Sequence, residues 1–327
     1  MVQYLIILLD DASTSYCHYS NRETKRLMPL DTLKQGILYA MKENLMIQFV
    51  YPDYELPQEY KDVIDSIDHS DIVSSSCEDT VIKENADVVV FNGWTDIDSC
   101  NLSDETAYVI RTNKADLFGK RQLLKSLISK TARLNVVITD VETFTEEDFG
   151  TYKEALAMLS EEVEKLYMEG KYPQMNILTD RMMLDKMNNC NAGWENITLA
   201  PDGCFYVCPA FYLAGDEEDF GLGKAKYSIG DLENGPDIKN PQLYRLDHAP
   251  ICRHCDAYQC KRCVWLNRKT TYEVNTPSHE QCVVAHLERN ASRNLLNRIR
   301  RHGTFLPERE EIKEIDYLDP FDVKEEW

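Results

Sequence analysis

The first 185 residues predict an α/β fold built on a parallel sheet. Short, continuously apolar runs such as residues 4–9 are typical of parallel strands that are buried on both faces. These runs alternate with longer segments whose apolar residues recur every three to four positions, as they do in helices. Six strands that alternate with helices predict either an open doubly wound sheet or a partial (β/α)6 barrel of the TIM type, and we favour the barrel.

The expected elements follow one another along this segment. Strands are expected at residues 4–9, 46–51, 88–91, 108–110, 136–139 and 175–178. Helices are expected at residues 33–41, 117–128 and 146–169, and Asp31 is placed to cap the first of them. Residues 53–85 and 93–105 are polar and show no clear period, so no element is assigned to them.

Length and charge limit the class of protein. A chain of 327 residues has room for two domains, and the composition changes after Asp185. We therefore expect domains at 1–185 and 186–290, followed by a tail at 291–327 that is helical and then acidic. The net charge of −20 argues against nucleic acid and membrane as partners, because both require a basic surface, and it permits a basic peptide. The start of the chain lacks the basic region of a signal peptide, and no run approaches the roughly 20 apolar residues of a membrane span, so a cytoplasmic location is expected.

Cysteines dominate the second segment. It holds eight of the eleven in the chain: Cys190, Cys204, Cys208, Cys252, Cys255, Cys260, Cys263 and Cys282. The reducing cytosol argues against disulfide bonds between them. Four of them form two CxxC pairs within residues 252–263, and thiolates at this spacing can turn back on one centre. The pattern predicts ligation of a metal ion or an iron–sulfur cluster.

The residues around the cysteines are rich in glycine and proline. Pro201-Asp202-Gly203 predicts a turn between two short strands, and this hairpin would bring Cys190 near Cys204 and Cys208. A segment with so few residues for a hydrophobic core needs another source of stability, which a bound metal centre would provide.

The order of these features resembles a SPASM domain, the C-terminal auxiliary-cluster domain of radical-SAM peptide-modifying enzymes. The resemblance rests on Cys190, Gly203 with Cys208 five residues on, Ile229-Gly230-Asp231-Leu232, the cysteines of residues 252–263, and Cys282. The gaps in the family knot are two, five and three residues, and here they are two, four and two. The resemblance implies two [4Fe-4S] clusters. One would be held by Cys252, Cys255, Cys260 and Cys282, and the other by Cys190, Cys208 and Cys263 with Cys204 as the fourth ligand.

Structural zinc is the alternative metal. Zinc also takes four thiolates, and His254 or His248 would be further donors.

Four thiolates leave a [4Fe-4S] centre negatively charged. The basic residues around the knot that would offset this charge are Arg253, Lys261, Arg262 and Arg268.

The loop after the first strand departs from that of a radical-SAM enzyme. Such enzymes carry CxxxCxxC there, and the three thiolates leave one iron open to bind S-adenosylmethionine. In this chain Ser13, Cys17 and Ser20 occupy those positions, with Tyr19 before the last. A neutral serine hydroxyl is a poor iron ligand, so we expect neither a catalytic cluster nor S-adenosylmethionine here. In the alternative interpretation Cys17 is an ordinary loop thiol and the spacing is a coincidence.

Residues 3–19, the absent ligands and the SPASM-like part together resemble the CXXX repeat peptide maturase family. This resemblance implies a pseudo-radical-SAM protein that takes part in maturing a ribosomally made, Cys-rich peptide without cleaving S-adenosylmethionine. Two alternatives stay open. A non-catalytic adaptor would hold the precursor peptide for a radical-SAM partner at a barrel mouth near Asp10, Asp11 and Tyr51. A zinc-stapled structural protein would have no peptide chemistry.

Overall fold

The computed structural model describes residues 2–95, 97–98, 100–213, 227–314 and 318. By their contacts these residues fall into two compact units, each made of two chain segments. The first unit combines the chain up to residue 92 with residues 191–248, and the second combines residues 93–190 with the chain from residue 249 on. These boundaries differ from the expected segments 1–185, 186–290 and 291–327, which stay a prediction. No helix in the described ranges is both long and apolar enough to cross a membrane.

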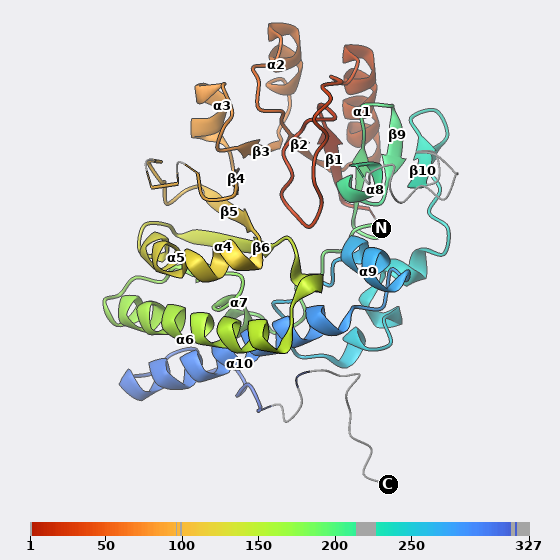
Figure 1. Ribbon diagram of the computed structural model, residues 1–327. Coiled ribbons are helices and arrows are strands. Elements are labelled where there is room, and N and C mark those ends of the chain that lie inside the picture. Colours follow the sequence, from red (N-terminus) through yellow and green to blue (C-terminus); the bar gives the residue numbers. More distant parts are fainter. Residues whose placement is uncertain (1, 96, 99, 214–226, 315–317, 319–327) are drawn as a thin grey trace. The chain divides into compact units, whose positions relative to one another are not determined.

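The first unit is built on a mixed sheet (Figure 1). Its strands are β1 (Tyr4–Leu8), β2 (Met46–Val50), β3 (Ser70–Ser74), β4 (Val88–Asn92), β8 (Asn196–Leu199), β9 (Cys204–Tyr206), β10 (Ser228–Asp231) and β11 (Gly235–Pro236). They lie in the order β11-β10-β9-β8-β1-β2-β3-β4. Strands β8, β1, β2, β3 and β4 are parallel, and β8 to β11 pair antiparallel. Strand β1 lies in the middle of the parallel part, and its residues from Leu5 to Leu8 are buried, as its continuous apolar run predicts.

The helices of the first unit correct two expectations. They are α1 (Leu30–Glu43), α2 (Gln58–Ile64), α3 (Thr80–Asn85) and α8 (Pro209–Leu213), with 3-10 turns at Pro241–Tyr244 and Leu246–His248. The expectation that Asp31 caps α1 is wrong, because the helix begins at Leu30 after Pro29 and Asp31 lies in its first turn. Residues 53–85, which show no clear period, contain α2, β3 and α3. These elements are too short for a periodic pattern to emerge.

The predicted hairpin is confirmed. Strands β8 and β9 pair antiparallel across the Pro201-Asp202-Gly203 turn. Gly203 adopts φ +80°, a conformation that residues with a side chain rarely adopt. The Asp202 carboxylate accepts a hydrogen bond of 3.0 Å from the Cys204 amide, which is the usual role of aspartate in a turn.

The second unit contains a small parallel sheet covered by helices (Figure 1). Its strands are β5 (Ala107–Thr112), β6 (Arg133–Ile138) and β7 (Gln174–Met175). Its helices are α4 (Lys114–Gly119), α5 (Arg121–Ile128), α6 (Glu146–Met168), α7 (Asp180–Met183), α9 (Val264–Thr271) and α10 (His279–His302), with 3-10 turns at Val141–Thr143 and Cys252–His254. The single helix expected at 117–128 is two helices, which meet at Lys120.

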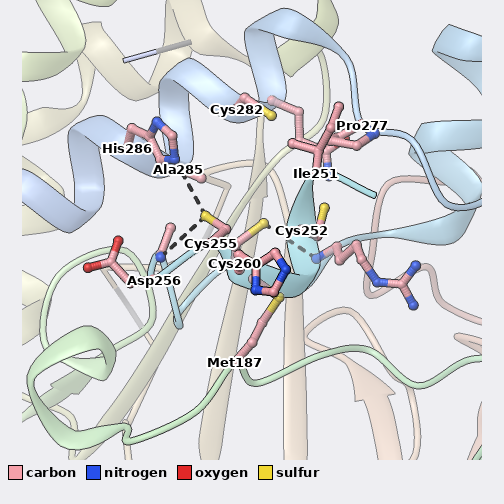
Figure 2. A pocket seen from close by; sticks show the side chains of 14 residues that line it. Met187, Ile251, Cys252, Cys255, Asp256, Cys260, Pro277, Cys282, Ala285 and His286 are labelled. Atoms are coloured by element: carbon pink, nitrogen blue, oxygen red, sulfur yellow. Dashed lines mark hydrogen bonds between the residues drawn. The ribbon is translucent and has the colours of Figure 1, made fainter. Parts of the chain in front are cut away.

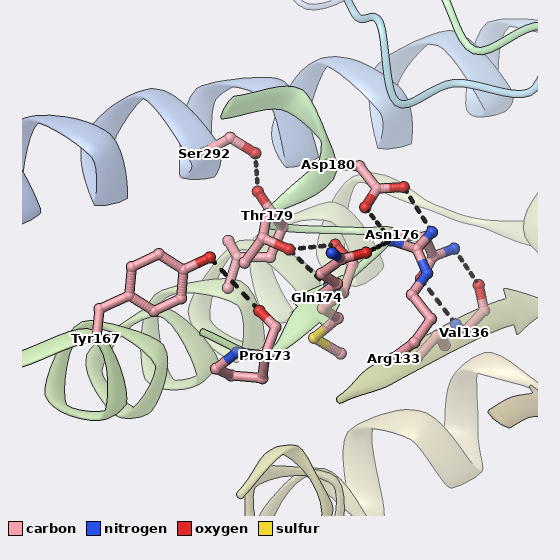
Figure 3. Close-up of polar contacts among 11 residues, drawn as sticks. Arg133, Val136, Tyr167, Pro173, Gln174, Asn176, Thr179, Asp180 and Ser292 are labelled. Atoms are coloured by element: carbon pink, nitrogen blue, oxygen red, sulfur yellow. Dashed lines mark hydrogen bonds and ion pairs between the residues drawn. The ribbon is translucent and has the colours of Figure 1, made fainter. Parts of the chain in front are cut away.

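Strand β7 is shorter than predicted. Beyond it, a side chain makes the hydrogen bonds to β6 that the backbone of a longer strand would make. The Asn176 amide accepts from the Val136 N–H and donates to the Val136 carbonyl, both at 2.8 Å (Figure 3). Arg133 of β6 holds Asp180 with a hydrogen bond of 2.8 Å from its second guanidinium nitrogen (Figure 3). The chain therefore leaves the sheet at Asn176 and turns into α7.

Helix α10 packs along α6, and this packing positions the start of α10. The Tyr152 hydroxyl of α6 donates to Glu288 of α10 at 2.8 Å, and Arg298 pairs with Glu164 at 2.8 Å. Ser278 caps α10 by accepting a hydrogen bond from the Gln281 amide. Cys282 is therefore held in the first turn of a long, fixed helix, where it is buried.

Candidate metal centre

Four of the predicted cysteine ligands surround one cavity in the second unit (Figure 2). The cavity has a volume of about 190 Å³ and is lined by Cys252, Cys255, Cys260 and Cys282. Cys252 lies in a 3-10 turn and Cys282 in the first turn of α10, while Cys255 and Cys260 lie in the loop between the 3-10 turn and α9. These are the four cysteines that the SPASM resemblance assigns to one cluster.

Backbone amides point at the sulfur atoms of this loop. The Ala257 amide lies 3.4 Å from the Cys255 sulfur, and the Arg262 amide lies 3.4 Å from the Cys260 sulfur. The Leu266 amide lies 3.4 Å from the sulfur of Cys263. An N–H donor stabilises a thiolate more than a neutral thiol, because hydrogen bonds to charged groups are the stronger ones. The local fold therefore favours these sulfurs as metal ligands.

Burial acts in the opposite direction on the same thiols. It raises the pKa of Cys252 to about 11 and the pKa of Cys260 to about 12. The pKa of Cys255 is also raised, chiefly by burial. Thiols in such surroundings keep their protons at neutral pH unless a cation binds to them. A metal centre would supply that cation.

The remaining four predicted ligands are divided between the units. Cys190 and Cys263 belong to the second unit, and the Cys190 amide donates a hydrogen bond of 2.8 Å to the Lys261 carbonyl. Burial and then the neighbouring Cys190 raise the pKa of Cys263 to about 12. Cys204 and Cys208 belong to the first unit, where Cys204 begins β9 and Cys208 directly precedes α8. The assignment of these four to one cluster stays a prediction.

All eleven cysteines lie among the described residues, and none forms a disulfide bond. Within the described ranges, no group of three or more His, Cys, Asp or Glu side chains is arranged to hold a single metal ion. Four of the cysteines line one cavity.

Buried positive charge surrounds the cysteines. Arg262, Arg289 and Arg181 are 0%, 1% and 8% exposed. Arg289 pairs with Asp256, its Nε atom lying 2.6 Å from Oδ1, and Arg181 lies 3.5 Å from the same carboxylate. Burial raises the pKa of Glu288 to about 7, so this carboxyl is only partly charged at neutral pH. Buried charges require partners of opposite sign. The donor set and this excess of positive charge together fit an anionic metal–thiolate centre.

The structure shows which basic residues near the cysteines are buried. Of the four expected from the sequence, Arg253 and Lys261 are exposed, and Arg268 stacks 5.5 Å from the ring centre of Tyr272. Arg262 alone among these four is buried. Arg181 and Arg289 were not predicted, because they lie on α7 and α10, far from the knot in sequence.

The two histidines that the zinc alternative offers as donors are both exposed. His254 lines the cavity, whereas His248 belongs to the first unit and pairs with Asp247. A third histidine was not predicted from the sequence. His286 lines the cavity as well, with Nε2 3.5 Å from the sulfur of Cys255 (Figure 2). The sequence feature that could have identified His286 is its position four residues after Cys282, because residues at this spacing share one face of a helix.

The loop after β1 belongs to the first unit and is closed by internal hydrogen bonds. Ser13 is completely buried, and its hydroxyl donates to the Val50 carbonyl at 2.7 Å and accepts from the Asp10 amide at 3.0 Å. Cys17 is half-buried and Ser20 is exposed. The Ser13 hydroxyl is thus committed to the backbone of β2.

The paired carboxylates of this loop are committed as well. Asp10 and Asp11 are 0% and 3% exposed. Asp10 accepts from the Tyr54 hydroxyl at 2.7 Å, and Asp11 accepts from the Tyr212 hydroxyl and faces Arg22 at 3.6 Å. Both carboxylates therefore have partners within the first unit, and a peptide site near Asp10, Asp11 and Tyr51 stays a prediction. They stabilise a polar strand end.

Comparisons with known proteins bear on the fold. No family model matches the chain, and no curated protein matches its sequence. Among solved structures it is similar to anSMEcpe with bound AdoMet, at a TM-score of 0.60 and 12% identity over 92% of this chain and 100% of that chain. The structure of anSMEcpe with bound AdoMet and the Cp18Cys peptide gives a TM-score of 0.59 at 12% identity, with the same coverage. The chain thus has the α/β fold of these structures.

Proposed function

We propose that this chain is an iron–sulfur protein that takes part in the maturation of a ribosomally made, Cys-rich peptide. The observation that carries the proposal is the cavity lined by Cys252, Cys255, Cys260 and Cys282 in a chain with a radical-SAM-like fold. A peptide partner is supported by the anSMEcpe structure, which was solved with a peptide and AdoMet. The CXXX repeat peptide is the substrate class that the sequence resemblance implies.

The four cavity cysteines would hold a [4Fe-4S] cluster, and Cys190 and Cys263 would contribute to a second. Such clusters supply electron transfer, or an iron that accepts a substrate thiolate. The residues around the cysteines would stabilise the charged form of such a cluster. Amide donors at Cys255 and Cys260 stabilise the thiolates, and buried guanidinium groups offset the negative charge.

The proposed protein does not cleave S-adenosylmethionine. One of the three expected thiols, Cys17, is present in the loop after β1. Ser13 in the first position is buried, and its hydroxyl donates to the Val50 carbonyl and accepts from the Asp10 amide. The same observation favours a second candidate function, in which the chain is a non-catalytic adaptor that holds the peptide for a radical-SAM partner.

Metal analysis of anaerobically isolated protein tests the proposal. We expect iron and acid-labile sulfide in comparable amounts, with little zinc. Cys282→Ser should lower the iron content, whereas Cys100→Ser, outside the cavity, should leave it unchanged. Zinc without sulfide would overturn the iron–sulfur proposal and leave the zinc-stapled structural protein.

A peptide assay separates the two candidate functions. The reconstituted protein is mixed with a synthetic CXXX repeat peptide and a reductant, with and without S-adenosylmethionine. A mass change of the peptide without any partner enzyme supports direct maturation. Binding without a mass change supports the adaptor, and formation of 5′-deoxyadenosine by this protein alone would overturn our interpretation of the loop after β1.

A further inference from the structure

Arg262 stands out among the basic residues near the cysteines. Its side chain is completely buried, although it carries a permanent charge. Its backbone adopts φ +45°, in the left-handed region that residues other than glycine rarely occupy. Strained residues of this kind persist where the surroundings determine them, and they gather at functional sites. A buried charge on a strained backbone therefore requires an explanation.

The contacts of Arg262 tie together the chain segments that carry the cysteines. Its Nε atom donates a hydrogen bond of 2.9 Å to the side-chain oxygen of Asn189, directly before Cys190. Its own amide lies 3.4 Å from the sulfur of Cys260. The preceding residue, Lys261, accepts a hydrogen bond from the Cys190 amide through its carbonyl. Arg262 is thus fixed between the Cys190 segment and the cavity loop.

The side chain of Arg262 lies near cysteines of both groups. It lines the cavity. Burial lowers the pKa of its guanidinium, and the neighbouring cysteines that oppose this effect are Cys252, Cys190, Cys260 and Cys263. Two of these line the cavity, and the other two are the pair of the second unit that lies outside it. Neutral thiols do not compensate a buried guanidinium, whereas thiolates do.

We propose that Arg262 is the shared countercharge of two thiolate pairs, Cys252 with Cys260 and Cys190 with Cys263, and that it couples their loading with metal. Arg262 is a positioning residue that acts through the thiolates. The inference rests on the metal centre of the proposed function, but not on its peptide chemistry.

Metal binding is the first test. Arg262→Met keeps much of the side-chain volume and removes the charge. We expect about ten- to hundredfold weaker metal retention, measured as competition with a chelator, because residues behind the ligands contribute on that scale. Arg262→Lys keeps the charge and should recover most of the loss. Arg253→Met and Lys261→Met are matched controls, since both residues flank cysteines and are exposed.

Stability of the metal-free protein is the second test, and it distinguishes a countercharge from a structural role. With metal bound, Arg262→Met should unfold at a lower urea concentration than the wild type, because the positive charge that faces the metal–thiolate centre is gone. Without metal, the difference between the two proteins should be much smaller. A residue that serves only packing would destabilise both forms when it is replaced.

The outcomes separate the two proposals. If the wild type retains metal and Arg262→Met retains it equally, the inference on Arg262 is wrong and the metal centre stands. If Arg262→Met lowers stability equally in both forms, the inference is wrong as well. A wild type that takes up neither iron nor zinc overturns the metal centre and the inference with it.

Discussion

The Nε2 atom of His286 lies 3.5 Å from the Sγ atom of Cys255. The other ring nitrogen, Nδ1, contacts the Leu318 carbonyl. A carbonyl only accepts hydrogen bonds, so Nδ1 carries the proton of this contact. Histidines at metal centres are held in this way, with one nitrogen on a backbone carbonyl and the other toward the metal side. The pair links helix α10 to the cavity loop.

Replacing this histidine should weaken the metal centre. His286→Phe keeps a ring of similar size and removes both nitrogens. We expect the metal to be released to a chelator about tenfold faster, because the Cys255 sulfur loses its polar neighbour. His302→Phe on the same helix is the control, since His302 is exposed. Equal release from both variants would show that His286 serves packing alone.

Metal uptake should depend steeply on pH. Burial raises the pKa of Cys252 to about 11 and that of Cys260 to about 12, so both are protonated in the metal-free protein at neutral pH. Binding as thiolates releases these protons, and rising pH therefore favours binding. For each thiol that loses its proton, the apparent affinity should rise about tenfold per pH unit. Competition with a chromophoric chelator between about pH 6.5 and 8.5 measures this slope, and a flat profile would contradict it.

Glu288 should make the metal-free protein less stable as the pH rises. Burial raises its pKa from 4.5 to about 7. At pH values between these two, the folded state holds a proton that the unfolded state has released, so the free energy of unfolding falls as the pH rises through this range and levels off above it. Glu288→Gln stays neutral and should remove this fall, which amounts to about 3 kcal/mol.

Urea unfolding between about pH 4.5 and 8 compares wild type and Glu288→Gln. The variant should gain on the wild type as the pH rises, with little difference at the acid end. The amide oxygen still accepts the hydrogen bond from Tyr152, so the packing of α6 against α10 is kept. Glu308→Gln, which changes an exposed carboxylate, should follow the wild type at every pH. Parallel curves for wild type and Glu288→Gln would refute the raised pKa.

Restoring thiols to the loop after β1 should not restore a radical cluster. Ser13→Cys replaces a completely buried hydroxyl whose hydrogen bond to Val50 is 2.7 Å long. A thiol donates weakly, so the variant should lose about 1 kcal/mol of stability. Ser20→Cys, at an exposed position, should unfold as the wild type does. The double variant should not cleave S-adenosylmethionine, and detection of 5′-deoxyadenosine would show that the loop can open.

Much of the sheet could be predicted from local patterns. Strands β1, β4 and β5 contain continuously apolar runs, which are typical of parallel strands buried on both faces. Strand β3 was missed because its first residues, Ser70 and Asp71, are polar and half-buried. The pairing of β8 with β1 was not predicted, because it joins residues almost 200 positions apart and leaves no local trace.

The candidate cysteine ligands, by contrast, form a pattern in the local sequence. A CxxC pair encodes its own turn, so its capacity to bind metal is a local property, and the ligation itself stays a prediction. The charge around those cysteines is not local. Arg181, Arg289 and His286 come from helices α7 and α10, and their burial beside the cavity depends on how those helices pack.

The sequence by itself determined the parallel α/β architecture of residues 1–185, the hairpin at Pro201 and the cysteines that would hold metal. Only the tertiary structure decided that four of those cysteines share a cavity, that Arg262 is buried where Arg253 and Lys261 are exposed, and that Ser13, Asp10 and Asp11 are turned inward. The physical reason is that spacing and periodicity reside in neighbouring residues, whereas burial of a charge is set by the distant segments that pack over it.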